Sequence, residues 1–433
     1  MKKKIINLLE AHKEISSWSL TVQHEERDEL YLIFDSVEQK RRVEEILYRV
    51  EILVHKEKKG KRFTGSASFQ VLPGETENEI KKKIDDAVTA ASLALNPFYD
   101  YDAFVPIEKG AETCDPLIRK DREKAINEIK KTIFNQMEEN PDVRLASSEI
   151  FLSHNRFERF NSKGLDHKSE NSRILLEAVF LTGEGENEVE SVLMRIERFI
   201  DILDLKNLLQ KYIGFAQDNV KAQLPKTGKC DVIFTEEALD NFFDFYTTQL
   251  NASMKFNKSS VFEPGDAIAE DFHGDKLSLS FNPHIPGGYL SMDYDQYGTV
   301  AQRADVIQDG IVTGFAADRK YATYLNMPCT GSPGNTEVKC GTRSIKELET
   351  EGTYVLSRFS TFTPNALTGA FSGEIRNGYV VKNGKRIPVK GGSVTGMMKE
   401  AMSRVFFSSE EIIRRNYKGP EYIKVLNVDI AGN

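Results

Sequence analysis

The sequence predicts an α+β protein, with helices and an antiparallel sheet of hairpins in the N-terminal half and a mostly-β C-terminal region that forms a curled sheet or a barrel. Two observations predict the first part: apolar residues alternate over 48–54 and 143–160, and they recur at helical spacing over 80–91 and 126–137. A third observation predicts the mostly-β C-terminal region, because hairpin turn signals become frequent after about residue 260.

The length of 433 residues suggests two or three domains, at roughly 150 residues each. We expect an N-terminal α+β domain (1–98), a middle α+β domain (117–221) and a C-terminal β-rich domain (230–433). Residues 97–116 carry prolines and aromatic residues without a clear period, which is typical of a linker.

The N-terminal domain is predicted to be a hairpin followed by a helix. The strand around 48–54 turns through Lys58–Lys61 and returns as a second strand over 63–71. Thr76 and Glu79 have the spacing of a capping box, so a helix should start there and end before Asn96-Pro97.

The middle domain is predicted to hold two amphipathic helices around three strands. The first helix has apolar residues at 126, 129, 133 and 137, and the second follows near Leu205–Ile213. The strands are expected at 143–160, 172–182 and 188–195.

The C-terminal domain opens with a short strand at 231–234 and an amphipathic helix that Thr235 caps. The apolar face of this helix consists of Leu239, Phe242, Phe243, Tyr246 and Leu250. Hairpin signals follow at Asp309-Gly310, Asn377-Gly378 and Asn383-Gly384, and a late helix is expected near 396–405.

Composition excludes several classes of function. Lys plus Arg number 58 and Asp plus Glu number 66, so the net charge of −8 argues against a direct nucleic-acid binder. No run approaches about 18 uncharged apolar residues, and the short apolar run after Lys2–Lys4 is too brief for a signal peptide, so no membrane partner is expected. The four Cys form no CxxC, which favours a reduced, cytoplasmic setting.

Two motifs resemble ligand sites but lack an essential residue. Asp293 to Gly298 opens like a calcium loop, yet the twelfth position is Ala304 rather than Glu, so we interpret it as an exposed turn. Gly183-Glu-Gly185 lacks the third glycine of a dinucleotide fingerprint and reads as a hairpin turn. Neither a phosphate-binding loop nor a nucleophile elbow is present.

Two weaker alternatives remain open. His273 and His284, with Cys329 and Cys340, have the chemistry of a metal site, although their spacing matches no known ligand frame. The loops 286–288 and 331–334 are rich in glycine, which permits a close ligand but more often simply makes a turn.

Several further segments are distinctive, and they are spread in order along nearly the whole chain: Tyr48–Ile52, Gly65–Ser68, Pro73-Gly74, Asn282–Gly288, Gly298–Arg303, Val306–Phe315, Asp318-Arg319, Leu367–Phe371, Tyr379–Val389 and Val428–Asn433. These segments resemble the TldD/PmbA family, which is also labelled "modulator of DNA gyrase". The ordered set is more specific than any one segment.

The resemblance implies a heteromeric metallopeptidase that acts on peptides or unfolded chains. In its catalytic branch, His-Glu-x-x-x-His on the first helix of the third domain and a C-terminal Cys hold zinc, and the Glu is the general base. Counting back from Asn257–Phe262 places those three positions at Phe243, Asp244 and Thr248. Moreover, no His occurs between His167 and His273, and no Cys follows Cys340.

The resemblance therefore places the chain in the PmbA/TldE-like branch, which lacks the zinc motif. We predict no catalytic, cofactor-binding or metal-binding residue, and we interpret Phe243 as a core residue. Whether the chain counts as an enzyme stays open, because it resembles a hydrolase family but is expected to be inactive alone.

Three hypotheses follow. The first is a non-catalytic subunit that pairs with a zinc-bearing TldD-like paralogue and helps to hold a peptide or unfolded protein, with a homodimer forming in the absence of that partner. The second is a regulatory binding protein linked to DNA gyrase or to toxin–antitoxin control. The third is a peptidase with a different metal site at His273 and His284.

Overall fold

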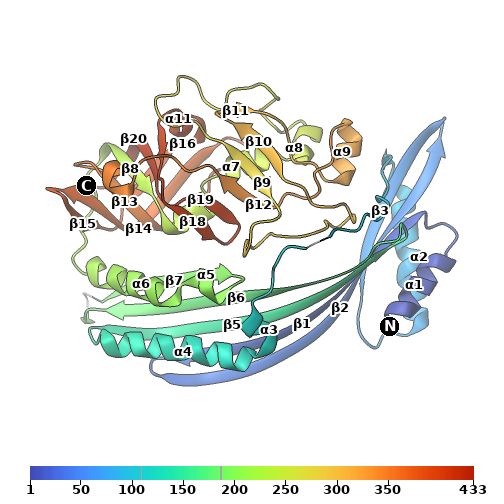
Figure 1. Cartoon of the computed structure of the whole chain (residues 1–433), viewed down its shortest axis with the longest axis horizontal. Helices are drawn as coiled ribbons and strands as arrows, with labels where there is room; N and C mark the ends of the chain where they lie inside the picture. Colours follow the sequence, from blue (N-terminus) through green and yellow to red (C-terminus); the bar gives the residue numbers. More distant parts are fainter. Residues whose placement is uncertain (109, 186–187) are drawn as a thin grey trace.

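A computed structural model describes residues 1–108, 110–185 and 188–433. One antiparallel sheet of seven strands sweeps beneath the C-terminal half, from one side of the molecule to the other (Figure 1). Its strands lie in the order β4-β3-β2-β1-β5-β6-β7. They are β1 (Ser17–Ile33), β2 (Ser36–Lys58), β3 (Lys61–Val71), β4 (Asn96–Pro97), β5 (Val143–Asn161), β6 (Asp166–Thr182) and β7 (Val189–Glu197).

Two groups of helices cover different parts of this sheet and enclose separate hydrophobic clusters. Helices α1 (Lys2–Ala11) and α2 (Glu77–Leu93) pack against the strands β1–β3 around Trp18. Helices α4 (Arg122–Glu139) and α6 (Leu205–Asn219) pack near β5–β7, with the short α3 (Pro116–Lys120) and α5 (Ile200–Leu203) before them. The predicted capping box of α2 is present.

Five strands of the C-terminal half close into a barrel. Their order is β13-β8-β20-β16-β14, and β14 pairs again with β13. They are β8 (Gly228–Phe234), β13 (Tyr354–Phe362), β14 (Ala370–Lys382), β16 (Ser393–Met397) and β20 (Ile423–Ala431). Strand β15 (Lys385–Val389) pairs with β14, β17 (Val405–Phe407) pairs with β20, and α11 (Met398–Ser403) follows β16.

A second C-terminal sheet lies against the barrel, with the order β11-β10-β9-β12-β19-β18. Its strands are β9 (Leu279–Asn282), β10 (Ala304–Gln308), β11 (Ile311–Val312), β12 (Asn335–Val338), β18 (Glu411–Arg414) and β19 (Tyr417–Pro420). The neighbouring helices are η2 (Glu236–Asp240, a 3₁₀ helix), α7 (Asp244–Gln249), α8 (Ala252–Phe256), α9 (Arg319–Leu325) and α10 (Ile345–Leu348).

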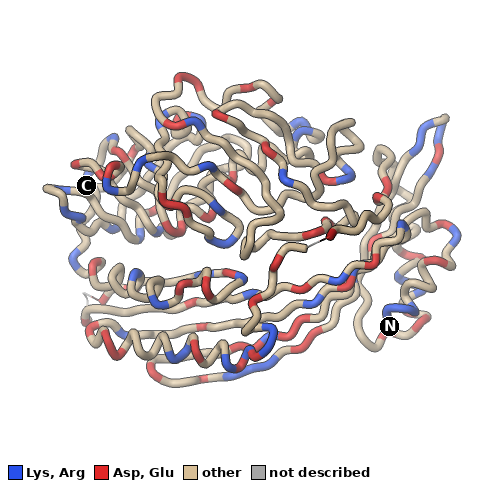
Figure 2. The backbone as a smooth tube through the Cα atoms, in the orientation of Figure 1, with Lys and Arg blue, Asp and Glu red and all other residues tan. Residues whose placement is uncertain are grey.

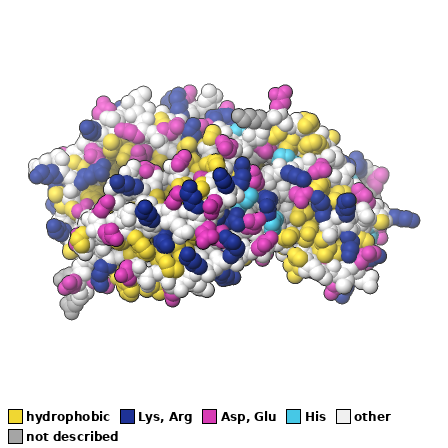
Figure 3. Space-filling model, turned by 60° about the horizontal axis from the view of Figure 1, so that its bottom comes forward, with side chains coloured by type: hydrophobic (Ala, Val, Ile, Leu, Met, Phe, Trp, Pro, Cys, Tyr) yellow, Lys and Arg dark blue, Asp and Glu magenta, His cyan; other side chains and the backbone are white. Residues whose placement is uncertain are grey.

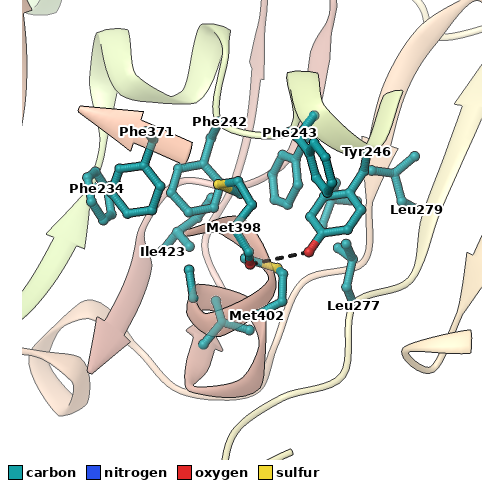
Figure 4. Packing of buried hydrophobic residues seen from close by; sticks show 14 of the residues in the cluster. Phe234, Phe242, Phe243, Tyr246, Leu277, Leu279, Phe371, Met398, Met402 and Ile423 are labelled. Carbon is teal, nitrogen blue, oxygen red and sulfur yellow. Dashed lines mark hydrogen bonds between the residues drawn. The ribbon is translucent and has the colours of Figure 1, made fainter. Parts of the chain in front are cut away.

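One continuous cluster of buried side chains joins the barrel to this second sheet. Figure 4 shows Phe234 and Phe371 of the barrel strands facing Phe242, with Met398 of α11 beneath them. The buried hydroxyl of Tyr246 donates a hydrogen bond to the backbone oxygen of Met398 at 3.2 Å. This bond satisfies the one polar atom of the Tyr246 side chain.

The predicted fold class is confirmed: the chain is α+β, with an antiparallel N-terminal sheet and a C-terminal barrel. The best hairpin signal is also confirmed, since Asn383 and Gly384 have φ of 51° and 70° and join Lys382 to Lys385 across a two-residue turn. The three domain boundaries stay a prediction. Strands β1 and β5, from the first and second predicted domains, pair in one sheet.

The helix predicted at the start of the C-terminal domain is wrong in two respects. The single helix expected over 235–250 is divided into η2 and α7, because Asn241 leaves the helical backbone (φ −128°) and donates its side-chain amide to the Phe362 carbonyl at 3.2 Å. Thr235 does not cap with its side chain, since its hydroxyl donates instead to the Glu421 carbonyl at 3.0 Å.

The turn predicted at Asn377-Gly378 is also wrong, because these residues lie inside β14. A Cβ on Gly378 would come 2.6 Å from the side chain of Leu356, so the glycine serves close strand packing rather than a turn. Asn377 is fully buried and donates to the side-chain oxygen of Asn219 on α6 at 3.3 Å.

Charges of both signs are interspersed along the sheet and the barrel (Figure 2). The face at the bottom of Figure 1 shows the same mixture of Lys, Arg, Asp and Glu around small apolar patches (Figure 3). Among the helices that the structure describes, none is long and apolar enough to cross a membrane.

Candidate functional site

The segment that opens the C-terminal domain has an aromatic ring where the resemblance placed the first metal ligand. Phe243 is 3% exposed, and its ring stacks on that of Tyr417 with centroids 5.9 Å apart. It also contacts Phe242 edge-on at 5.2 Å. These contacts confirm Phe243 as a core residue. Asp244 and Thr248, at the other two positions, are half-buried.

A cavity of about 440 Å³ lies close to this segment, between the seven-stranded sheet and the barrel domain. Its walls come from β7, η2, the end of β13 and the connection from β18 to β19. Strand β7 is the last strand of its sheet, so its outer edge pairs with no other strand in the described ranges. A strand edge with unpaired main-chain groups therefore borders the cavity.

Largely buried ion pairs line this cavity. The Arg414 guanidinium, 1% exposed, binds both carboxylate oxygens of Asp240 at 2.5 and 2.8 Å. Nε of Arg358 donates to Glu237 at 2.9 Å. Since a buried charge is costly without a partner, these pairs hold η2 against β13 and β18.

A third pair lies on β7 itself. Nη2 of Arg195 is 3.1 Å from Glu197, and both side chains are almost fully buried. The same Glu197 carboxylate accepts hydrogen bonds from the backbone N–H of Arg415 at 3.0 and 3.2 Å. Burial raises the pKa of Glu197 to about 7, although Arg195 and that N–H lower it in part. Its charge therefore changes close to neutral pH.

Asp244 provides a pH-dependent test of this region. Burial raises the pKa of its carboxyl to about 6, against 3.8 in the unfolded chain, and the Arg415 charge offsets only part of that rise. Between these values the unfolded state has lost its proton and the folded state has kept it, so this group lowers stability as the pH rises. We expect Asp244→Asn to gain thermal stability over the native chain as the pH rises from 4 to 6, with a constant gap above pH 6.

Unfolding temperatures of both proteins at pH 4, 5, 6 and 8 check this expectation. A gap that does not change with pH would show that the Asp244 carboxyl titrates normally in the folded chain.

The calcium-like segment is a turn, but it is buried rather than exposed. Asp295 is 2% exposed, and one of its carboxylate oxygens accepts hydrogen bonds from the backbone of Tyr297 and Thr299 at 2.8 and 3.0 Å. The other oxygen accepts from the Ser332 N–H at 3.1 Å. These acceptors are occupied by the chain itself, and Ala304 begins β10.

The glycine-rich loops are explained by close packing. A Cβ on Gly287, which has φ 75°, would come 2.0 Å from the side chain of Ile202 on α5. A Cβ on Gly334 would come 2.6 Å from the Pro283 backbone. Gly183 and Gly185 lie between β6 and β7 with positive φ, as a hairpin turn requires, although residues 186–187 of that connection are outside the described ranges.

His273, His284, Cys329 and Cys340 are not part of any group of three potential metal ligands in the described part of the chain. Nε2 of His284 lies 3.0 Å from the Ala301 carbonyl. The third hypothesis, a metal site built on these residues, therefore gains no support.

Three other potential metal ligands do lie close together. One ligand atom each of Cys114, His154 and Glu170 lies within 4.8 Å of the others. Nε2 of His154 is 2.7 Å from one Glu170 oxygen, and the Arg119 guanidinium is 2.7 Å from the other. Because this guanidinium repels a cation and already satisfies the carboxylate, we interpret the group as a hydrogen-bonded structural cluster.

These features define a class: an α+β protein in which a long antiparallel sheet lies beside a barrel domain (Figure 1). Residues 227–432 match the family model of the PmbA/TldA metallopeptidase C-terminal domain. The resemblance to the TldD/PmbA family that the sequence predicted is therefore confirmed.

Relatives and solved structures extend the similarity to the rest of the chain. A zinc metalloprotease TldD homolog from Saccharolobus solfataricus is 24% identical over 398 residues, which cover 84% of this chain and 87% of that protein. TldE from Thermococcus kodakarensis shares the fold with a TM-score of 0.79 and 17% identity, over 100% of both chains. A candidate modulator of DNA gyrase from Bacteroides thetaiotaomicron has a TM-score of 0.83 and 18% identity, over 100% of this chain and 99% of that one.

The sequence did not reveal the charged cavity. Its residues come from four distant segments, and Arg195 and Glu197 follow the ordinary alternation of a strand. The one available signal was that Arg195 and Glu197 alternate with the same period as Ser191 and Leu193, so all four side chains project from the buried face of β7. A charged side chain on a buried face requires a partner, and the sequence could not identify that partner.

Proposed function

We propose that this chain is the non-catalytic, TldE/PmbA-like subunit of a TldD/PmbA-type metallopeptidase complex that processes peptides or unfolded proteins. The observation that carries the proposal is the family frame around Phe243, which fills the position of a metal ligand with a buried ring. An aromatic hydrocarbon cannot bind zinc, and the half-buried Thr248 is a poor substitute for imidazole. The residues present do not fit the family's metal.

The role left to this chain is to hold the substrate. The edge of β7 that pairs with no other described strand presents main-chain donors and acceptors along the cavity wall, and such an edge binds an extended peptide with little regard to its sequence. The paralogue would supply the zinc ion and the general base. Pairing would also enclose the substrate and keep folded proteins away from the cutting site.

The test is to reconstitute the pair. The purified chain is mixed in equal amounts with its His-Glu-x-x-x-His paralogue from the same genome, and digestion of an unstructured protein such as casein is followed. We expect the mixture to digest casein and each component alone to be at most weakly active. A paralogue whose motif Glu is replaced by Gln is the matched control and should leave the mixture inactive.

Two results contradict the proposal. One is equal activity of the paralogue with and without this chain, and the other is chelator-sensitive digestion by this chain alone. Light scattering of the same samples tests the related proposal that the chain is a homodimer when its partner is absent.

The alternative function is a regulator linked to DNA gyrase or to toxin–antitoxin control. The observation that favours it is the description of the Bacteroides structure as a candidate gyrase modulator. Because positive and negative charges are interspersed along the chain (Figure 2) and on the face drawn in Figure 3, we expect any such effect to be indirect and not to involve nucleic acid. A salt-resistant complex of the purified chain with gyrase would favour this alternative. The proposed setting for both functions is the cytoplasm.

A further inference from the structure

Arg195, in the cavity wall, has two hydrogen-bond donors that lack an acceptor among the described residues. Its side chain is 6% exposed, and only Nη2 has an ion-pair partner, Glu197. Nε and Nη1 are both buried without an acceptor among the described residues. A buried N–H of a charged group that lacks an acceptor is costly, so these two donors indicate a place where a ligand acceptor would be stabilised.

The other charges of the cavity are matched or positive. Arg414 is bound by Asp240 and Arg358 by Glu237. The Arg415 side chain also lines the cavity. Its charge acts on Glu197, Asp240 and Asp244, without a close ion pair to any of them among the described residues. The two Arg195 donors that lack an acceptor and the charge of Arg415 together favour an anion.

We propose that this cavity binds the carboxylate group of a peptide, with Arg195 as its buried donor and Arg415 as a second positive charge. The inference rests on the proposed peptide-holding function and adds which part of the peptide is anchored. A carboxylate fits better than a phosphate because Glu197, Glu237 and Asp240 also line the cavity and repel a dianion more strongly than a single charge. The β7 edge lies in the same wall, so the anchored group is presented next to main-chain pairing positions.

The groups around Glu197 give the site a direction of pH dependence. Arg195 faces it from its own strand, Arg415 from the β18–β19 connection, and Asp240 from η2. Burial raises the pKa of Glu197 to about 7, so this carboxylate gains a proton as the pH falls below that value. A protonated Glu197 is neutral and no longer competes with a ligand for Arg195. Carboxylate binding should therefore strengthen as the pH falls from 8 to 6.

Matched peptides test the inference. A fluorescent, unstructured peptide with a free C-terminal carboxylate is compared with its C-terminal amide, and a second pair has its internal Glu residues replaced by Gln. Fluorescence anisotropy is measured with the full chain and with its complex with the paralogue, at pH 6 and pH 8. We expect the free acid to bind about 10-fold or more tightly than the amide at pH 6, as for a charge-assisted hydrogen bond.

Substitutions connect the effect to the residues. Arg195→Gln should abolish the preference for the acid, Arg195→Lys should keep part of it, and Arg376→Gln, at an exposed arginine of β14, should leave it unchanged. Since Arg195→Gln removes a buried charge and can impair folding, Arg415→Gln and the pH dependence of the native chain provide independent measurements. The Arg415→Gln variant should show a weaker preference for the free acid than the native chain. The native chain should itself show a weaker preference at pH 8 than at pH 6.

The outcomes separate the two proposals. Equal binding of acid and amide, with equal binding of the Glu and Gln peptides, overturns the inference and leaves the peptide-holding function standing. A preference that follows the internal Glu instead supports the carboxylate site with a side chain as the source. Stronger competition by inorganic phosphate than by acetate overturns the choice of carboxylate, and no binding of any peptide by the chain or the complex overturns both proposals.

Discussion

Replacing Phe234 by alanine should destabilise the C-terminal domain by about 3–5 kcal/mol. Phe234 is fully buried at the end of β8, where its ring lies 5.2 Å from Phe242 and 5.3 Å from Phe362. Phe371 meets it edge-on at 6.0 Å. The closed barrel leaves these rings little freedom to fill the space, so most of the lost contact would persist as a cavity (Figure 4).

Amide hydrogen exchange in β8 and β20 measures this loss locally, because the protection of those strands reports their own opening free energy. The matched control is Phe34→Ala at the turn between β1 and β2, where the ring is 56% exposed and the expected change is within about 0.5 kcal/mol. Comparable losses from both substitutions would show that burial at Phe234 does not stabilise the barrel.

Arg414→Met should destabilise the chain by about 3–5 kcal/mol, although methionine is apolar and of similar length. Arg414 is 1% exposed and is the ion-pair partner of Asp240 and Glu236. Its removal leaves Asp240 without the guanidinium that binds both of its oxygens. The loss therefore comes from a largely buried carboxylate that is left without its partner, more than from lost packing.

Urea unfolding followed by circular dichroism checks this expectation, with the double variant Arg414→Met, Asp240→Asn as a second measurement. The double variant should recover part of the loss because it also removes the abandoned charge. Arg376→Met is the exposed control, since its pair with Glu374 is 47% and 49% exposed and contributes at most about 1 kcal/mol. A single variant as stable as the native chain would exclude a structural role for the Arg414 ion pairs.

Local patterns predicted those elements whose structure depends on neighbours in sequence. The alternation over 143–160 predicted β5, and the Thr76 and Glu79 pair predicted the start of α2. The buried face of a strand and the N-cap of a helix both depend on residues within a few positions of one another. The Asn383-Gly384 turn was predicted for the same reason, since positive φ at two successive positions selects these residue types.

Predictions failed where a distant partner decided the outcome. Asn241 interrupts a helical pattern because a carbonyl of β13 accepts its amide, and Gly378 lies in a strand because Leu356 packs above it. The cavity was missed for a similar reason, as Arg195 and Arg414 are brought together only by the fold. By contrast, Phe243 was predicted to be a core residue, because it continues the apolar face of its segment.

The pairing of β1 has a practical consequence for handling this protein. Residues 19–33 are bonded along their length to residues 147–161, which lie beyond the proline-containing connection at 97–116. A protease that nicks this connection would cut the chain without releasing a fragment, since the two pieces would still share a ladder of backbone bonds. Gel electrophoresis under denaturing conditions would then show two bands where gel filtration shows a single species.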